Sequence, residues 1–126
     1  MSHKHILIGA VLVTTVAGVS AATRDDDMKK LAATSGCMTC HHIDPGAKGP
    51  DGLAPVGPAW RDVATKYKGD TRATDQLTRI VMTGSNPYAS HWKGKVSGLA
   101  MPPNAVAIQE ADARKLVSWI LGLSSK

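Results

Sequence analysis

The sequence predicts an all-α protein, and three observations support this fold class. Four segments place apolar residues at the three- and four-residue spacing of a helix. Two long stretches between them are rich in glycine and proline, and no segment shows the apolar–polar alternation of a half-buried strand. A chain of 126 residues, 43% hydrophobic and 20% charged, has room for one folded domain. We therefore expect four helices joined by two long loops.

The first 21 residues are expected to be a signal peptide. Lys4 and the free amine make a positive start, residues 6–19 are uncharged and mostly apolar, and small residues surround Ala21 and Ala22. These are the three regions of a secretory signal, and the apolar run is shorter than the ~18–20 residues that span a bilayer. Cleavage near Ala21/Ala22 would leave a domain of residues 22–126 in the periplasm. The alternative is an uncleaved N-terminal anchor.

The first helix is expected over about residues 25–35. Three aspartates at its start suit a helix N-terminus, where free N–H groups favour negative charge. Gly36 follows as a stop signal. The apolar stripe of this helix consists of Met28, Leu31 and Ala32.

The other three helices follow the first long loop, residues 42–58. One is expected over residues 60–68, and the next runs from a cap at Asp70 or Thr71 to about Thr83. After a second irregular stretch, residues 85–106, the strongest periodicity covers residues 109–123. The apolar face of this last helix consists of Ala113, Leu116, Val117, Ile120 and Leu121.

One short motif carries the chemistry. Residues 37–41 read Cys-Met-Thr-Cys-His, the C-x-x-C-H pattern of a c-type haem attachment site. Two thiols at this spacing reach both vinyl groups of one porphyrin, and the histidine that follows lies under the iron. A bound cofactor would also supply the apolar volume that a chain with no phenylalanine and 4% aromatic residues lacks.

The motif allows three other interpretations. A dithiol redox site expects a βαβ context, which the sequence does not show. A zinc site would use Cys37, Cys40, His41 and His42, but these lack the usual distance between ligand pairs. A local disulfide would close a very short loop and stabilise little. The exported leader and the missing aromatic volume favour haem.

The candidates for a second axial ligand to the iron are methionines and histidines. Met28 and Met82 fall on predicted apolar helix faces, where packing is the more frequent role. Met38 and His42 lie in or beside the attachment turn, so they cannot reach the opposite face of the haem. His91 lies in a loop from which it could reach the iron. Met101 precedes two prolines that stiffen its loop, so ligation there costs little conformational entropy.

The combined motifs resemble a class I cytochrome c, with the closest likeness to the small single-haem bacterial members. The likeness covers about residues 27–126. It rests on the attachment motif, Val56-Gly57-Pro58-Ala59-Trp60, Arg79-Ile80, Thr83-Gly84-Ser85, Met101-Pro102-Pro103-Asn104 and Trp119. The resemblance implies the cytochrome c fold: about four helices packed around one covalently bound haem c, with long Gly/Pro-rich loops.

The resemblance also implies a role for each matching residue. Cys37 and Cys40 would form the two thioethers, with His41 and Met101 as axial ligands. The Pro58 carbonyl would bind the second ring nitrogen of His41 and raise its basicity. Asn104 would form a hydrogen bond near the Met101 sulfur. Arg79 and Trp92 would face the haem propionates.

The expected function is one-electron transfer by a periplasmic shuttle, because two protein ligands leave no open position on iron for a substrate. An enzyme or gas sensor with a labile Met101 is the less favoured possibility. The main alternative is a dedicated haem subunit of a periplasmic oxidoreductase complex. With 15 Lys+Arg against 10 Asp+Glu and no basic run, nucleic acid is not an expected partner. We expect a monomer that meets redox proteins, and lysines in the two loops would favour acidic ones.

Overall fold

The structure, a computed structural model, describes residues 17–123. Its four α-helices are α1 (Ala17–Thr34), α2 (Trp60–Lys66), α3 (Ala73–Thr83) and α4 (Glu110–Leu121), and its two 3₁₀ turns are η1 (Cys37–Thr39) and η2 (Pro50–Gly52). Over this part of the chain, the only β pairing is an isolated bridge between Lys93 and Val96. The predicted all-α class with four helices is therefore confirmed.

The structure corrects the predicted start of the first helix. α1 begins at Ala17, not near Asp25. The intervening residues include several alanines and no glycine or proline after Gly18, so the helix extends through them at little cost. The predicted cleavage point at Ala21/Ala22 lies inside α1, whereas residues 1–16 of the predicted signal peptide lie outside the described range.

Three smaller differences concern helix ends. α2 ends at Lys66, two residues early, because Tyr67 has left the helical conformation and Gly69 has a φ of +81°. Asp70 accepts a hydrogen bond from the Arg72 N–H at 2.9 Å, so it stabilises the turn before α3 and does not cap the helix itself. α4 covers Glu110–Leu121, slightly shorter than the predicted 109–123.

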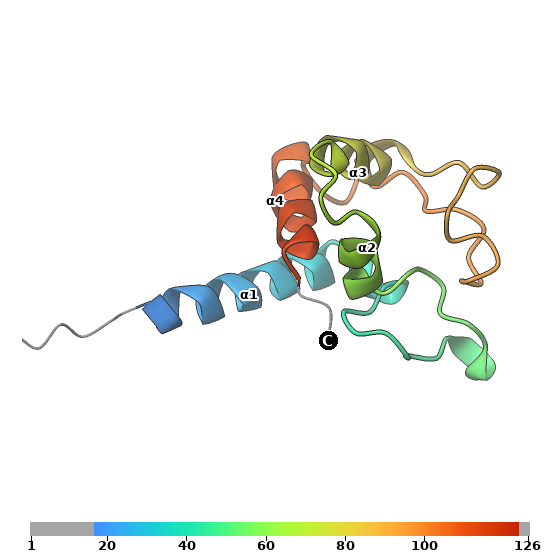
Figure 1. The fold of residues 1–126 in the computed structure, drawn as a ribbon, viewed down its shortest axis with the longest axis horizontal. Coiled ribbons are helices and arrows are strands. Elements are labelled where there is room, and N and C mark those ends of the chain that lie inside the picture. The colour runs from blue at the N-terminus through green and yellow to red at the C-terminus, as the bar shows by residue number, and fades with distance from the viewer. Residues whose placement is uncertain (1–16, 124–126) are drawn as a thin grey trace, which may run out of the picture.

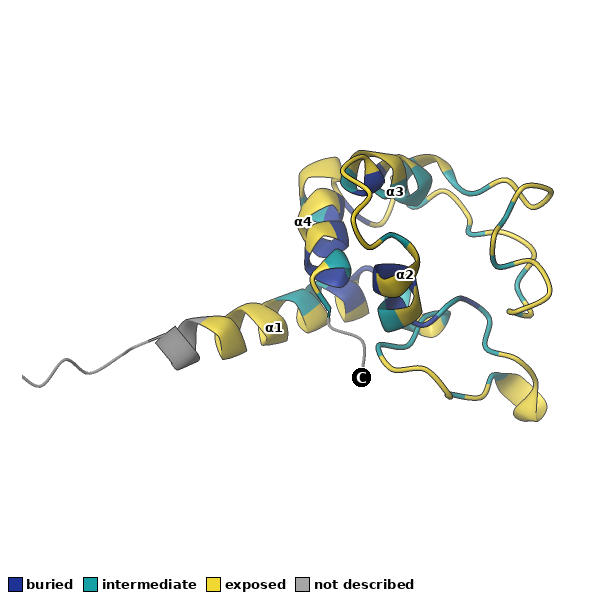
Figure 2. Ribbon diagram, viewed as in Figure 1, coloured by how far each residue is buried: buried dark blue, intermediate teal, exposed yellow. Residues whose placement is uncertain are grey.

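α4 is the centre of the fold, and it packs against each of the other three helices (Figure 1). Its buried face includes Leu116, Trp119 and Ile120, and the Trp119 ring meets the Trp60 ring edge-on at 5.8 Å between centroids. Burying two such rings contributes more than area alone, because edge-to-face pairs are electrostatically favourable. Buried residues gather on α4, α2 and the end of α1 nearest them (Figure 2).

The N-terminal part of α1 projects away from this packed body and is exposed (Figures 1 and 2). The Trp119 Nε1–H on α4 donates a hydrogen bond to Asp25 Oδ1 on α1 at 2.8 Å. This bond links the two terminal helices. None of the described helices has the length and hydropathy that crossing a bilayer requires.

The two long loops meet on the side of the molecule away from α1 (Figure 1). The Ser97 N–H donates to the Pro55 carbonyl at 2.9 Å, and the Gly98 N–H donates to the Val56 carbonyl at 3.0 Å. A Cβ on Gly98 would lie 2.5 Å from the Val56 oxygen, closer than packed atoms allow. Glycine therefore lets the two backbones approach, and their pairing fixes the loops around the site described next.

Candidate functional site

A cavity of about 690 Å³ lies between the helices and the two loops. Its lining is mostly apolar, and its volume falls in the ~300–1,000 Å³ range of cofactor sites. α3 contributes Leu77, Ile80 and Val81, whose side chains the sequence predicts on one helix face. α4 contributes Leu116, Val117 and Ile120. The predicted apolar faces of two helices are thus the walls of this cavity.

The attachment motif forms one part of the wall, and Cys37, Cys40 and His41 all line the cavity. Gly36 has a φ of +75°, which ends α1 and turns the chain into η1. The N–H groups of Cys40 and His41 then both bond the Cys37 carbonyl, at 3.3 and 3.1 Å. The two cysteines are not joined to each other by a disulfide. Burial raises the pKa of the Cys37 thiol.

The His41 ring is fixed in orientation and in tautomer. Its Nδ1 lies 2.8 Å from the Pro58 carbonyl oxygen, which can only accept, so Nδ1 carries the proton and Nε2 keeps its lone pair. The ring also stacks against Trp60 at 5.9 Å between centroids, with the planes 24° apart. Burial lowers the pKa of His41, and this outweighs the opposite effect of the Pro58 carbonyl. A neutral imidazole is the form that ligates a metal.

Gly57 allows the first loop to pass close to the His41 ring because it has no side chain. Its N–H donates to the Cys40 carbonyl at 2.8 Å. A Cβ at this position would lie 2.8 Å from Cε1 and 2.9 Å from Nδ1 of His41. Any other residue would therefore push the ring away from Pro58 or force the two segments apart.

Met101 also lines the cavity, on the second loop, and its backbone is held on both sides by Ser85. The Met101 N–H donates to Ser85 Oγ at 2.8 Å, and the Ser85 N–H donates to the Met101 carbonyl at 2.9 Å. A Cβ on Gly84 would lie 3.1 Å from the same carbonyl. The loop that carries the thioether is thus pinned to the end of α3.

The other four predicted site residues divide into two pairs. Pro58 and Trp92 line the cavity. Arg79 is exposed on α3, and neither it nor Asn104 is among the lining residues. The Asn104 amide donates to the Pro102 carbonyl at 2.6 Å and to the Val81 carbonyl at 3.4 Å, so it braces the loop that carries Met101.

The sequence alone indicates no role for Gly57 or Ser85, although both stand in motifs shared with class I cytochromes c. Gly57 precedes Pro58, and Ser85 follows the glycine that ends α3. A glycine before a proline in a loop indicates that the backbone passes close to another group. It does not indicate which group that is. The contact of Ser85 with Met101 spans 16 residues and only becomes visible in the fold.

The residues on the cavity wall fit a covalently attached haem. Two thiols and one imidazole with a free Nε2 share one turn, a thioether lies on a second segment, and apolar helix faces complete the lining. Across the described residues, no three His, Cys, Asp or Glu side chains are placed to hold a metal ion by themselves. The zinc interpretation therefore finds no support in the geometry.

Comparison with known proteins identifies the class. A sequence profile described as Cytochrome c matches residues 26–124. The chain belongs to the cytochrome c family. It is a small class I c-type cytochrome, which carries one covalently attached haem c.

Individual relatives agree with this assignment. The chain is 45% identical to cytochrome c-551 of Allochromatium vinosum over 93 residues, 74% of this chain and 82% of the relative. It is 35% identical to cytochrome c-552 of Hydrogenobacter thermophilus over 113 residues, 90% and 93% of the two chains. The crystal structure of Nitrosomonas europaea cytochrome c552 superimposes with a TM-score of 0.57 at 33% identity, over 75% of this chain and 96% of that one.

Proposed function

We propose that this cytochrome c is a periplasmic one-electron carrier that shuttles between redox proteins and is not itself an enzyme. The observation that carries the proposal is that His41 and Met101 line the same cavity. Both side chains would ligate the haem iron and would leave no position on it for a substrate. When bound, the haem supplies one-electron exchange between ferric and ferrous iron, and a thioether ligand favours the ferrous form.

The residues of the chain would prepare and hold these two ligands. Cys37 and Cys40 would bind the haem covalently, and His41 would offer Nε2 while Pro58 holds Nδ1–H. Ser85 and Asn104 would keep the Met101 segment in place in both oxidation states. Little rearrangement of the protein would then accompany the gain or loss of an electron. Trp92 and Arg79 would contact the haem propionates, and Asn104 would contact the Met101 sulfur.

Replacing Met101 tests the ligand assignment. Met101→Ala should remove the weak far-red absorption band that marks a sulfur–iron bond in the oxidised protein, and should lower the midpoint potential. Met82→Ala is the matched control, because Met82 packs against the core from α3 and should leave the band in place. A variant at Met101 that kept the band would show that another residue is the ligand.

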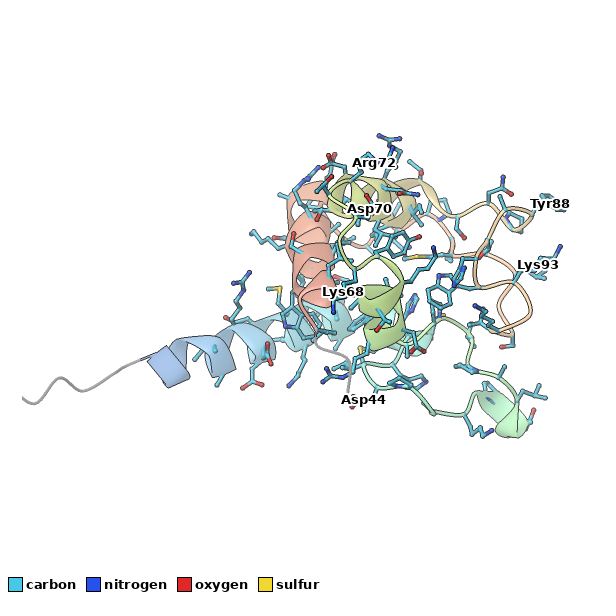
Figure 3. All side chains as sticks on the ribbon, viewed as in Figure 1. Asp44, Lys68, Asp70, Arg72, Tyr88 and Lys93 are labelled. Carbon is cyan, nitrogen blue, oxygen red and sulfur yellow. The ribbon has the colours of Figure 1, made fainter. Side chains whose placement is uncertain are left out.

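The loop lysines would steer the protein toward acidic redox partners. Lys48 lies in the first loop, and Lys93 and Lys95 lie in the second, where the Lys93 side chain points into solvent (Figure 3). Positive charge on this side accelerates encounter with an acidic surface and is screened by salt. Reduction by the partner should therefore slow as salt rises, and Lys93→Gln should weaken this dependence. Lys115→Gln, on α4 beside Asp112, should not.

Export is part of the proposal. Cleavage near Ala21/Ala22 would remove residues 1–21 and leave a monomeric domain of residues 22–126, which keeps Asp25 and the packed end of α1. Intact mass of the protein isolated from the periplasm should equal that chain plus one haem. A mass that includes residue 1 would favour the uncleaved anchor.

A further inference from the structure

A second cavity, of about 350 Å³, lies beside the haem cavity. It is bounded by the two long loops and the start of α2 (Figure 1). Pro58, Trp92 and Val96 line both cavities, so these three residues stand between them. The proposed iron ligands, His41 and Met101, do not line the second cavity. Its volume lies within the ~300–1,000 Å³ range of small-molecule sites, and the ligation of the iron leaves it without a role.

Backbone pairing and an ion pair fix the shape of this second cavity. The bond from the Ser97 N–H to the Pro55 carbonyl joins the two loops. Arg61 Nε on α2 donates to Asp44 Oδ1 at 2.7 Å, and the Arg61 N–H donates to the Ile43 carbonyl at 3.1 Å. These contacts tie the first loop to the helix. The cavity therefore exists before a ligand arrives, and binding costs little ordering of the loops.

The back of the second cavity is apolar and its rim is charged. Pro58 and Ala59 are half-buried and buried, whereas the lysines and aspartates of the lining are exposed. The indole of Trp92 adds a flat aromatic surface against which another ring can stack. A ligand that fits this arrangement has a planar apolar body and one charged group that stays at the opening.

The charges at the rim favour an anion. Lys48 on the first loop and Lys95 on the second supply two ammonium groups. Of the two carboxylates on the lining, Asp44 is paired with Arg61, which leaves Asp62 as the opposing charge. The formal charge of +5 on the whole chain adds to the attraction. Over the described residues, no group of three His, Cys, Asp or Glu side chains could hold a metal cation instead.

We propose that the second cavity is a binding site for a small aromatic carboxylate, a monoanion of the benzoate type. Its ring would lie against Trp92, and its carboxylate would pair with Lys48 and Lys95. His42 lines this cavity and not the haem cavity, so this neighbour of His41 would also contact the ligand. A small molecule fits better than a protein surface, because a protein interface covers ~800 Å² of each partner and this site is one recessed cavity.

The test is titration of the reduced holoprotein with benzoate at low salt, followed by calorimetry and by the NMR signal of the Trp92 indole N–H. Benzoate should bind at one site and shift this signal until it saturates. Benzamide has nearly the same shape without the charge and should bind about fivefold more weakly, and Lys48→Met should weaken benzoate binding by a similar factor. Lys93→Met is the matched control, because Lys93 does not line the cavity, and it should bind benzoate like the wild type.

A second variant fills the cavity without changing its charge. Ala54→Trp should abolish benzoate binding because Ala54 lines the cavity, whereas Ala105→Trp, exposed elsewhere, should not. The haem absorption spectrum shows that each variant is folded and loaded.

A wild type without a saturable shift, or an Ala54→Trp variant that binds benzoate as tightly as the wild type, would overturn the inference. If the wild type binds no benzoate and Ala54→Trp slows reduction by the partner protein, the cavity is a protein-docking site and the inference is wrong. Each of these results would leave the proposed electron-carrier function intact, because that function depends on the ligation of the iron.

Discussion

The absence of one side chain, at Gly57, sets how closely the first loop can approach His41. We expect Gly57→Ala to lower the stability of the holoprotein by about 1–3 kcal/mol, since the added methyl would overlap the ring at 2.8 Å. Urea unfolding followed at the haem absorption measures this loss. Gly122→Ala is the control, because a Cβ there would meet its nearest neighbour at an ordinary 3.4 Å. Equal stabilities of the two variants would contradict the proposed close approach.

Ser85 offers a second prediction at this scale. Ser85→Ala would leave the partly buried Met101 N–H without its 2.8 Å acceptor, at a cost of about 1 kcal/mol. Since that cost falls on the segment that carries the sulfur, the sulfur–iron band should disappear at a lower temperature than in the wild type. Ser97→Ala, whose hydroxyl is exposed and makes a long 3.4 Å bond, should melt like the wild type.

The sequence was most informative about residues whose partners are near in the chain. The spacing of Cys37, Cys40 and His41 is a local property, so their presence on one turn could be predicted. Gly57 and Ser85 act on groups 16 residues away in each case, and only the fold brings them together. Arg79 is exposed on α3, and its predicted role toward the haem propionates stays a prediction.

Among the elements, the contact between α1 and α4 depends on one polar bond as well as on packing. Asp25→Ala should destabilise the holoprotein by about 1 kcal/mol, because it removes the 2.8 Å acceptor of the Trp119 indole N–H. Asp26→Ala is the matched control, because the Asp26 side chain is largely exposed and its ion pair with Lys29 is long, at 3.8 Å. Such an exposed pair contributes little to stability. The difference in urea midpoint between the two variants measures the bond, and identical midpoints would show that packing alone holds the helices.

Helix positions could be predicted because each apolar stripe faces the core or the cavity. The helix ends were less predictable. The aspartates at residues 25–27 have the composition of a helix start, yet α1 continues through them toward Ala17 because the preceding alanines are equally compatible with a helix. The carboxylate of Asp25 accepts a hydrogen bond from Trp119 on α4, which explains an aspartate at this position. The neighbouring sequence does not distinguish this role from helix capping.

For the whole molecule, folding and haem attachment are linked. The cavity of about 690 Å³ is lined by residues from all three of the helices α2, α3 and α4, so without the haem their apolar faces have no partner. The double variant Cys37→Ala/Cys40→Ala should be colourless and should lose the cooperative thermal transition seen by far-ultraviolet circular dichroism. A sharp transition in that colourless variant would show that the helices pack without the cofactor.

The cavity wall combines residue 37, near the start of the domain, with residue 120, near its end, and the paired loops close over it. A rigid planar group is joined to two cysteines more easily before these segments have packed than afterwards. We therefore expect the prosthetic group to be joined to a polypeptide that is still open, with the last helix packing against it afterwards. A host that makes the chain faster than it attaches haem is therefore expected to accumulate unfilled polypeptide, and its capacity for haem attachment should limit the yield of holoprotein.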